Sequence, residues 1–144
     1  MKIKAKLLRC SVPAIAALVL VAGFCGLFGQ PKVRRYGMVI GINPEKIEAY
    51  KKLHAAAWPG VLQKIKECNI RNYSIYLREI ERGKFYLFSY FEYTGNDFQA
   101  DMAKMAADPT TQKWWKETDP CQIPIPTRAP KEFWSAMEEV FHSD

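Results

Sequence analysis

Histidine and cysteine are scarce in this chain, whose 144 residues include two histidines and four cysteines. His54 and His142 stand 88 positions apart, and no CxxC pair occurs. Protein metal sites are built from histidine, cysteine and acidic ligands at characteristic spacings, so the sequence predicts no bound metal. Internal repeats and low-complexity segments are also absent, and the length is that of one domain.

Acidic side chains are absent from residues 1–30, whose basic residues are Lys2, Lys4, Lys6 and Arg9. Residues 10–29 contain no charged residue. A short basic segment followed by an apolar run is typical of an export signal. The run, about 20 residues long, is also long enough to span a bilayer. We therefore predict a signal peptide or a membrane anchor at residues 1–30, and a domain at residues 31–144 outside the cytoplasm, most simply in the periplasm.

The charge of this domain argues against one class of partner. The whole chain has 21 basic and 15 acidic residues and a formal charge of +6, and setting aside the four basic residues of the N-terminal segment leaves +2. No basic stripe with interleaved aromatic residues remains, so we expect no nucleic-acid partner. Cys68 and Cys121 lie in the domain. In an exported protein they could form a disulfide, but isolated cysteines are more often small buried apolar residues.

A strand and an interrupted helix are predicted at the start of the domain. Residues 33–42 are rich in β-branched and aromatic side chains, and Asn43-Pro44 matches a helix N-cap followed by proline at the first helical position. The helix that begins there meets Pro59, which lacks an N–H group and disfavours the α conformation at the preceding residue. We expect the helix to break at Trp58 and a second helical piece to follow.

The next segments predict a hairpin, two helices and a tail. Residues 72–80 and 84–93 are strong β runs joined by a short link containing glycine, and Tyr73, Ile75 and Leu77 share one face of the first run. Helices are expected from Asn96 or Asp97 to Ala107, and over residues 109–118 after Asp108. Four prolines predict an extended segment at 120–130, and residues 133–142 fit either a helix or an edge strand.

This order of elements predicts a ferredoxin-like α+β sandwich, with helices on one face of an antiparallel sheet. The other face needs a cover in so short a chain. We expect it to be lined by several of the aromatic residues of the second β run, which are Phe85, Tyr86, Phe88, Tyr90, Phe91 and Tyr93. A second copy of the same sheet would cover them, so we predict a symmetric homodimer.

His54 stands where the first helix otherwise presents apolar residues. At the helical period, its neighbours on that face are Ile47, Tyr50, Ala57, Trp58, Val61 and Ile65. A histidine there is either neutral and hydrogen-bonded in the core, or it faces a pocket and moves protons for a bound ligand. The helical pattern alone favours the structural role.

Four sequence blocks carry a resemblance to a known family. They are NPEKIEAYKKLHAAAWPGV at 43–61, NYSIYL at 72–77, the pair Trp114-Trp115, and MEEVFH at 137–142. In this order and spacing they resemble the L-rhamnose mutarotase family across Arg34 to His142. The resemblance implies a dimeric α+β barrel that interconverts the α and β anomers of L-rhamnose without a cofactor. It also implies an acid/base role for His54 and sugar contacts from Tyr50, Tyr73, Trp114 and Trp115.

These residue types fit that chemistry. Opening the hemiacetal needs a group that accepts and returns a proton near neutral pH, and imidazole has an unperturbed pKa of about 6.5. Indole faces accept the C–H groups of a pyranose, and tyrosine hydroxyls hydrogen-bond to those of the sugar. Adjacent residues of a helix point in different directions, so one of Trp114 and Trp115 should pack while the other meets the sugar. We prefer Trp115 for that contact.

Two functions from other classes remain open at this stage. A non-catalytic exported sugar-binding module could keep the same pocket, and a cofactor-independent monooxygenase could use the same fold. The sugar could be another deoxyhexose. Members of the family act on a free sugar inside the cell, so the cytoplasm is the alternative location to the one that residues 1–30 predict.

Overall fold

An antiparallel sheet lies at the base of the computed structural model, which describes residues 33–143. Its strands are β1 (Arg34–Ile42), β2 (Ile70–Glu81), β3 (Lys84–Tyr93), β4 (Gln122–Ile123) and β5 (Ser135–Met137). The order across the sheet is β2-β3-β1-β4, and β5 also pairs with β1. The predicted signal or anchor at 1–30 lies outside the described residues. Within residues 33–143 no helix has the length and apolar character that crossing a membrane requires.

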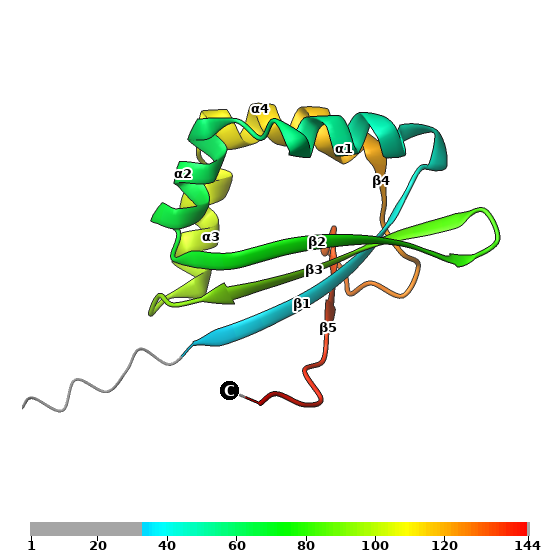
Figure 1. Ribbon diagram of the computed structural model, residues 1–144. Coiled ribbons are helices and arrows are strands. Elements are labelled where there is room, and N and C mark those ends of the chain that lie inside the picture. Colours follow the sequence, from blue (N-terminus) through cyan, green and yellow to red (C-terminus); the bar gives the residue numbers. More distant parts are fainter. Residues whose placement is uncertain (1–32, 144) are drawn as a thin grey trace, which may run out of the picture.

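The helices lie together on one side of this sheet (Figure 1). They are α1 (Ile47–Ala55), α2 (Pro59–Glu67), α3 (Phe98–Ala106) and α4 (Pro109–Thr118), with short 3₁₀ turns η1 (Pro44–Lys46) and η2 (Asp119–Cys121). The predicted ferredoxin-like α+β arrangement is confirmed. The sheet curls beneath the helices, and its opposite face carries no helix among the described residues.

The predicted break in the first helix is confirmed at Trp58. This residue has an extended conformation, with φ −65° and ψ 133°, and α2 starts at Pro59. The Ala56 N–H donates to the Leu53 carbonyl as α1 ends. Because Pro59 excludes the α conformation at Trp58, α2 runs in a different direction from α1 (Figure 1).

Side-chain caps begin three of the helical segments where the sequence placed them. Asn43 accepts from the Glu45 N–H at 3.0 Å, ahead of η1. Asp97 accepts from the Ala100 N–H at 3.0 Å, and Asp108 accepts from the Thr111 N–H at 2.8 Å. Each cap satisfies an N–H group that lacks a partner within its helix.

The hairpin of β2 and β3 is confirmed, and it contains a bulge that the sequence did not reveal. Gly83 adopts φ +75° in the turn, which a glycine does without steric cost. The pairing register shifts between Arg71 and Ser74, and Asn72 has φ +50°. The extra residue changes which side chains face the helices. As a result, Ile70 lies on the same covered face as Tyr73, Ile75 and Leu77.

The C-terminal segment differs in part from its prediction. Pro120 lies in η2 rather than in extended chain, and β4 is followed by turns at 126–127 and 130–131. The prediction of a continuous extended stretch at 120–130 is therefore wrong. The ambiguity over 133–142 is resolved as an edge strand, because β5 pairs antiparallel with Gly37–Val39 of β1.

Two buried clusters lie between the sheet and the helices. The first contains Ile40, Ile42, Ile47, Tyr50, Leu87 and Cys121, and the second contains Ile70, Phe91 and Tyr93. Phe91 and Tyr93 thus face the helices, and Phe85 packs against the first cluster. Tyr86, Phe88 and Tyr90 alternate with them and face the open side, as expected for several of the six aromatic residues. Cys68 and Cys121 are both buried as free thiols.

Candidate functional site

A cavity of about 210 Å³ lies between α1 and the sheet. Its roof comes from α1 and its floor from β1, β2 and β3, and its lining residues are Ile42, Ile47, Tyr50, Lys51, His54, Ile75, Leu77 and Leu87. Five of these are aliphatic, so a few polar groups converge in an otherwise apolar pocket. That composition is typical of a small-molecule site.

His54 lines this cavity, and one hydrogen bond determines which of its ring nitrogens carries the hydrogen. Its Nδ1 lies 3.0 Å from the carbonyl oxygen of Tyr50, one turn earlier in α1. A carbonyl only accepts hydrogen bonds, so Nδ1 carries the hydrogen and the lone pair is left on Nε2. Nε2 is therefore the atom of this side chain that can accept a proton from a ligand.

Burial keeps this imidazole uncharged. Desolvation lowers the pKa of His54 below its usual value of 6.5, and the hydrogen bond to the Tyr50 carbonyl offsets part of that effect. Burial disfavours the cation because a charged ring loses more hydration than a neutral one. At neutral pH the side chain is a free base.

Aromatic rings fix the orientation of His54. The Tyr50 ring stacks on the imidazole with centroids 4.0 Å apart, and the Trp114 ring meets it edge-on at 5.2 Å. Trp58 in turn contacts Trp114 edge-on at 5.4 Å. The imidazole is thus contacted by rings from α1 and α4, and Trp58 in the link before α2 supports the Trp114 ring.

Tyr50 is buried, and its hydroxyl stays protonated. Desolvation raises its pKa well above 10, and the nearby Tyr73, Cys121 and Asp119 raise it further. A side-chain hydrogen bond with Gln122 has the opposite, smaller effect. The hydroxyl is thus a neutral hydrogen-bond donor throughout the physiological pH range.

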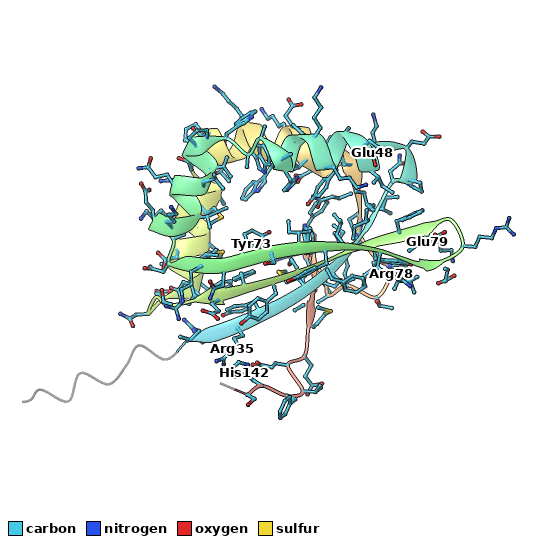
Figure 2. All side chains as sticks on the ribbon, viewed as in Figure 1. Arg35, Glu48, Tyr73, Arg78, Glu79 and His142 are labelled. Carbon is cyan, nitrogen blue, oxygen red and sulfur yellow. The ribbon has the colours of Figure 1, made fainter. Side chains whose placement is uncertain are left out.

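Tyr73 projects from β2 on the helix-covered side (Figure 2). Tyr73 is 44% exposed, and its ring meets the Phe91 ring edge-on at 5.6 Å. Desolvation raises the pKa of Tyr73 to about 12, so its hydroxyl stays protonated. The electrostatic effect of Tyr73 on Tyr50 shows that the two side chains face the same region.

The two tryptophans of α4 have different positions. Trp114 is 6% exposed and contacts both His54 and Trp58. Trp115 is half-buried and makes no ring contact with the other predicted site residues in the described part of the chain. The structure therefore brings His54, Tyr50 and Trp114 together, with Tyr73 nearby, and gives no contact that supports the preference for Trp115.

Two polar residues of this region were not singled out from the sequence. Lys51 lines the cavity and forms an exposed ion pair with Glu48, with Nζ and Oε1 2.8 Å apart; Glu48 is labelled on α1 in Figure 2. Gln122 reaches Tyr50 from β4. No local sequence signal marks Gln122, because its position depends on the pairing of β4 with β1, far away in the chain.

The contacts of the two tryptophans predict different costs of substitution. Trp114→Leu should lower the free energy of unfolding by about 2–3 kcal/mol, because it removes a buried ring from a packed cluster. Trp115→Leu should cost less than about 1 kcal/mol, since that ring is only partly buried and, among the described residues, makes no ring contact with the cluster around His54. Urea denaturation of both variants measures the difference, and equal losses would contradict this account of the packing.

Comparisons with known proteins agree with the fold and the motifs. Residues 35–143 match the family model of L-rhamnose mutarotase. An L-rhamnose mutarotase of Oceanobacillus iheyensis is 30% identical over 112 residues, which cover 78% of this chain and 100% of that protein. One from Listeria monocytogenes serotype 4b is 32% identical over 110 residues, 76% of this chain and 98% of that protein.

Two solved structures share the architecture. The crystal structure of an L-rhamnose mutarotase from Formosa agariphila has a TM-score of 0.56 and 23% identity, and covers 77% of this chain and 99% of its own. A tetracenomycin F2 cyclase from Streptomyces glaucescens has a TM-score of 0.53 and 17% identity, covering 76% and 95%. At these identities the structures confirm the fold alone. The family model and the sequence relatives establish that this chain belongs to the L-rhamnose mutarotase family, a family of carbohydrate isomerases.

Proposed function

We propose that this protein interconverts the α and β anomers of L-rhamnose, or of a related 6-deoxyhexose, by acid/base opening of the sugar ring at His54. The observation that carries the proposal is the hydrogen bond from Nδ1 of His54 to the Tyr50 carbonyl, which leaves a basic Nε2 on a histidine that lines a mostly aliphatic cavity. The family relatives named L-rhamnose mutarotase support the choice of sugar.

The reaction breaks and re-forms one carbon–oxygen bond, between C1 and the ring oxygen O5, and moves protons between oxygen atoms. Nε2 of His54 accepts the proton of the anomeric hydroxyl, and the electron pair of that O–H bond forms the C1=O bond. The C1–O5 bond breaks with its electrons on O5, which takes a proton from water or a tyrosine hydroxyl. Rotation about C1–C2 followed by the reverse steps gives the other anomer, and no proton is gained or lost overall.

The other groups of the site serve binding and proton donation. The raised pKa values of Tyr50 and Tyr73 keep both hydroxyls protonated, so each can donate to a sugar oxygen. Ile75, Leu77 and Leu87 form an apolar floor against which a C6 methyl group loses contact with water. A deoxysugar fits such a wall better than a sugar with a hydroxyl at C6, because that hydroxyl would lack a partner there.

Removal of the imidazole should abolish most of the enzymatic exchange. His54→Ala is expected to slow the interconversion of L-rhamnose anomers by ~10²–10⁴-fold, the usual contribution of a positioned proton-transfer group. Saturation-transfer NMR of the anomeric protons measures the rate. His142→Ala is the matched control, because His142 lies on the exposed C-terminal segment outside the cavity.

Two results would count against this mechanism in different ways. Exchange that survives His54→Ala would leave the activity in place but would remove His54 as its base. Wild-type exchange no faster than in buffer, with sugar binding retained, would favour the non-catalytic sugar-binding module.

The enzymatic rate should depend on pH in one direction. The active form is the neutral imidazole, and burial lowers the pKa of His54 below 6.5. The rate should therefore be constant near neutral pH and fall as the pH drops through a value below 6.5, where the imidazole becomes protonated. NMR exchange rates from pH 5 to 8, corrected with His54→Ala at each pH, give the midpoint. A midpoint above 6.5 would contradict the assigned environment.

We also infer that the protein is a homodimer built on the open face of the sheet. Tyr76 lies on this face opposite Phe88 and is 63% exposed, and Val140 and Phe141 of the C-terminal segment are among the most exposed apolar residues. Large apolar side chains left exposed on an uncovered sheet face and on the segment after it are typical of an interaction site. The arrangement supports a second copy of the sheet as its cover.

A charge on the open face should dissociate this dimer. Tyr76→Arg is expected to convert the protein to a monomer, since a guanidinium would be buried without a partner. Leu62→Arg is the control, because Leu62 is exposed on α2, on the helical side of the sheet. Light scattering after size exclusion gives the mass, and a monomeric wild type would overturn the inference.

We infer from the residue pattern at positions 1–30 that the domain acts outside the cytoplasm. The support is the basic segment followed by an uncharged apolar run, at positions outside the described residues. Cell fractionation with mass spectrometry of the N-terminus tests both the location and whether the segment is removed. Full-length protein in the cytoplasmic fraction would overturn the inference.

A further inference from the structure

We propose that Gln122 positions the sugar in this site: its amide nitrogen holds the Tyr50 hydroxyl, and its carbonyl oxygen accepts a hydrogen bond from a hydroxyl of the bound sugar. This inference rests on the proposed function, because it assigns a further residue to the same cavity. It adds a polar contact from β4, an element that supplies none of the cavity's lining residues.

The strand pairing puts Gln122 on the correct side of the sheet. β4 pairs antiparallel with β1, and Gln122 is directly opposite Ile42. Directly paired residues of antiparallel strands project from the same face. Ile42 lines the cavity, so the Gln122 side chain projects toward the same space. Figure 1 shows β4 leading from the end of the helical layer to the sheet, on the side of the molecule where α1 begins.

The hydrogen bond between Gln122 and Tyr50 has a direction. Oε1 of Gln122 is buried and has no partner among the described residues, so the bond to Tyr50 uses the amide nitrogen as donor. The Tyr50 oxygen therefore accepts from Gln122, and its own hydrogen is free to point elsewhere. Because the Tyr50 side chain lines the cavity, that hydrogen is available to a sugar oxygen.

Oε1 of Gln122 is the atom that accepts the hydrogen bond from the sugar. Buried polar atoms almost always have a hydrogen-bond partner, and an exception is destabilising. The terminal torsion of a glutamine is soft, so a small rotation changes the direction in which its oxygen points. A sugar carries several hydroxyl donors, and the cavity on the same face of the sheet, next to Ile42 and Tyr50, is lined mostly by aliphatic side chains. One sugar hydroxyl supplies the donor that Oε1 lacks.

The test compares sugar binding by the wild type and by Gln122→Met, which keeps the length of the side chain and removes both polar atoms. Calorimetry should show the Kd for L-rhamnose rising about tenfold, the loss expected for one to two hydrogen bonds. Gln63→Met is the matched control, because Gln63 is exposed on α2, away from the cavity, and donates a hydrogen bond to Glu67. Its Kd should equal that of the wild type.

Sugar analogues separate a direct contact from a structural effect. Calorimetry is repeated with 1,5-anhydro-L-rhamnitol and with the 2-, 3- and 4-deoxy forms of L-rhamnose. If Gln122 accepts from one hydroxyl, the analogue that lacks this hydroxyl should bind the wild type more weakly, and the effect of Gln122→Met should shrink for that analogue alone. An equal effect on every analogue, or no change in Kd for L-rhamnose, would overturn the proposal.

An unfolded variant or an inactive wild type would still allow the role of Gln122 to be decided, as long as the wild type binds the sugar. If circular dichroism shows that Gln122→Met is unfolded, Gln122→Asn replaces it, because the shorter amide withdraws the oxygen while keeping the site polar. Wild-type protein that binds L-rhamnose without exchanging its anomers would overturn the proposed function, and the analogue series would still decide the role of Gln122. A wild type that does not bind L-rhamnose would overturn both.

Discussion

The break between α1 and α2 determines where the site lies. Pro59 has no N–H group and forces Trp58 into an extended conformation, so the chain turns after Ala55. α1 then covers the cluster around Ile42 and Leu87, while α2 contributes Ile65 to the cover of the cluster around Phe91. His54 occupies the last turn of α1, above the first cluster. Trp58, in the break itself, packs on the Trp114 ring that holds His54.

Burial acts in opposite directions on the two kinds of titratable group at this site. It lowers the pKa of His54 and raises the pKa of Tyr50 and Tyr73, because in each case the charged form loses hydration. Both effects lead to the same state, in which the base is unprotonated and the hydroxyls keep their hydrogens. The site therefore holds a neutral acceptor and neutral donors together, and neither kind of group pays the cost of burying a charge.

The elements governed by local chemistry could be predicted from the sequence. The caps at Asn43, Asp97 and Asp108 and the break before Pro59 each depend on neighbouring residues, and all four are found where predicted. The hairpin likewise follows from two β runs and a turn with Gly83. The family resemblance, more than the helical pattern, moved His54 from a structural to a functional assignment.

The features that depend on distant parts of the chain could not be predicted. The bulge at Asn72 adds one residue against β3, and only the packing of Ile70 and Tyr73 against the same helical layer favours it. The rotation of α4 about its axis decides which tryptophan contacts His54. The sequence of α4 alone does not predict which of its faces packs against α1. The position of Gln122 depends on the pairing of the two-residue strand β4 with β1, and most of the domain's sequence lies between these two strands.

The same site carries several features that do not favour stability. The imidazole is desolvated, the cavity leaves the inner face of α1 incompletely packed, and Oε1 of Gln122 has no partner among the described residues. Natural proteins keep such features mainly where a ligand compensates for them. A pyranose has an apolar face and a ring of hydroxyls, and so suits an aliphatic floor with phenol and imidazole groups above it. Ring opening and closure create no lasting charge, which is why a neutral pocket is an appropriate environment for them.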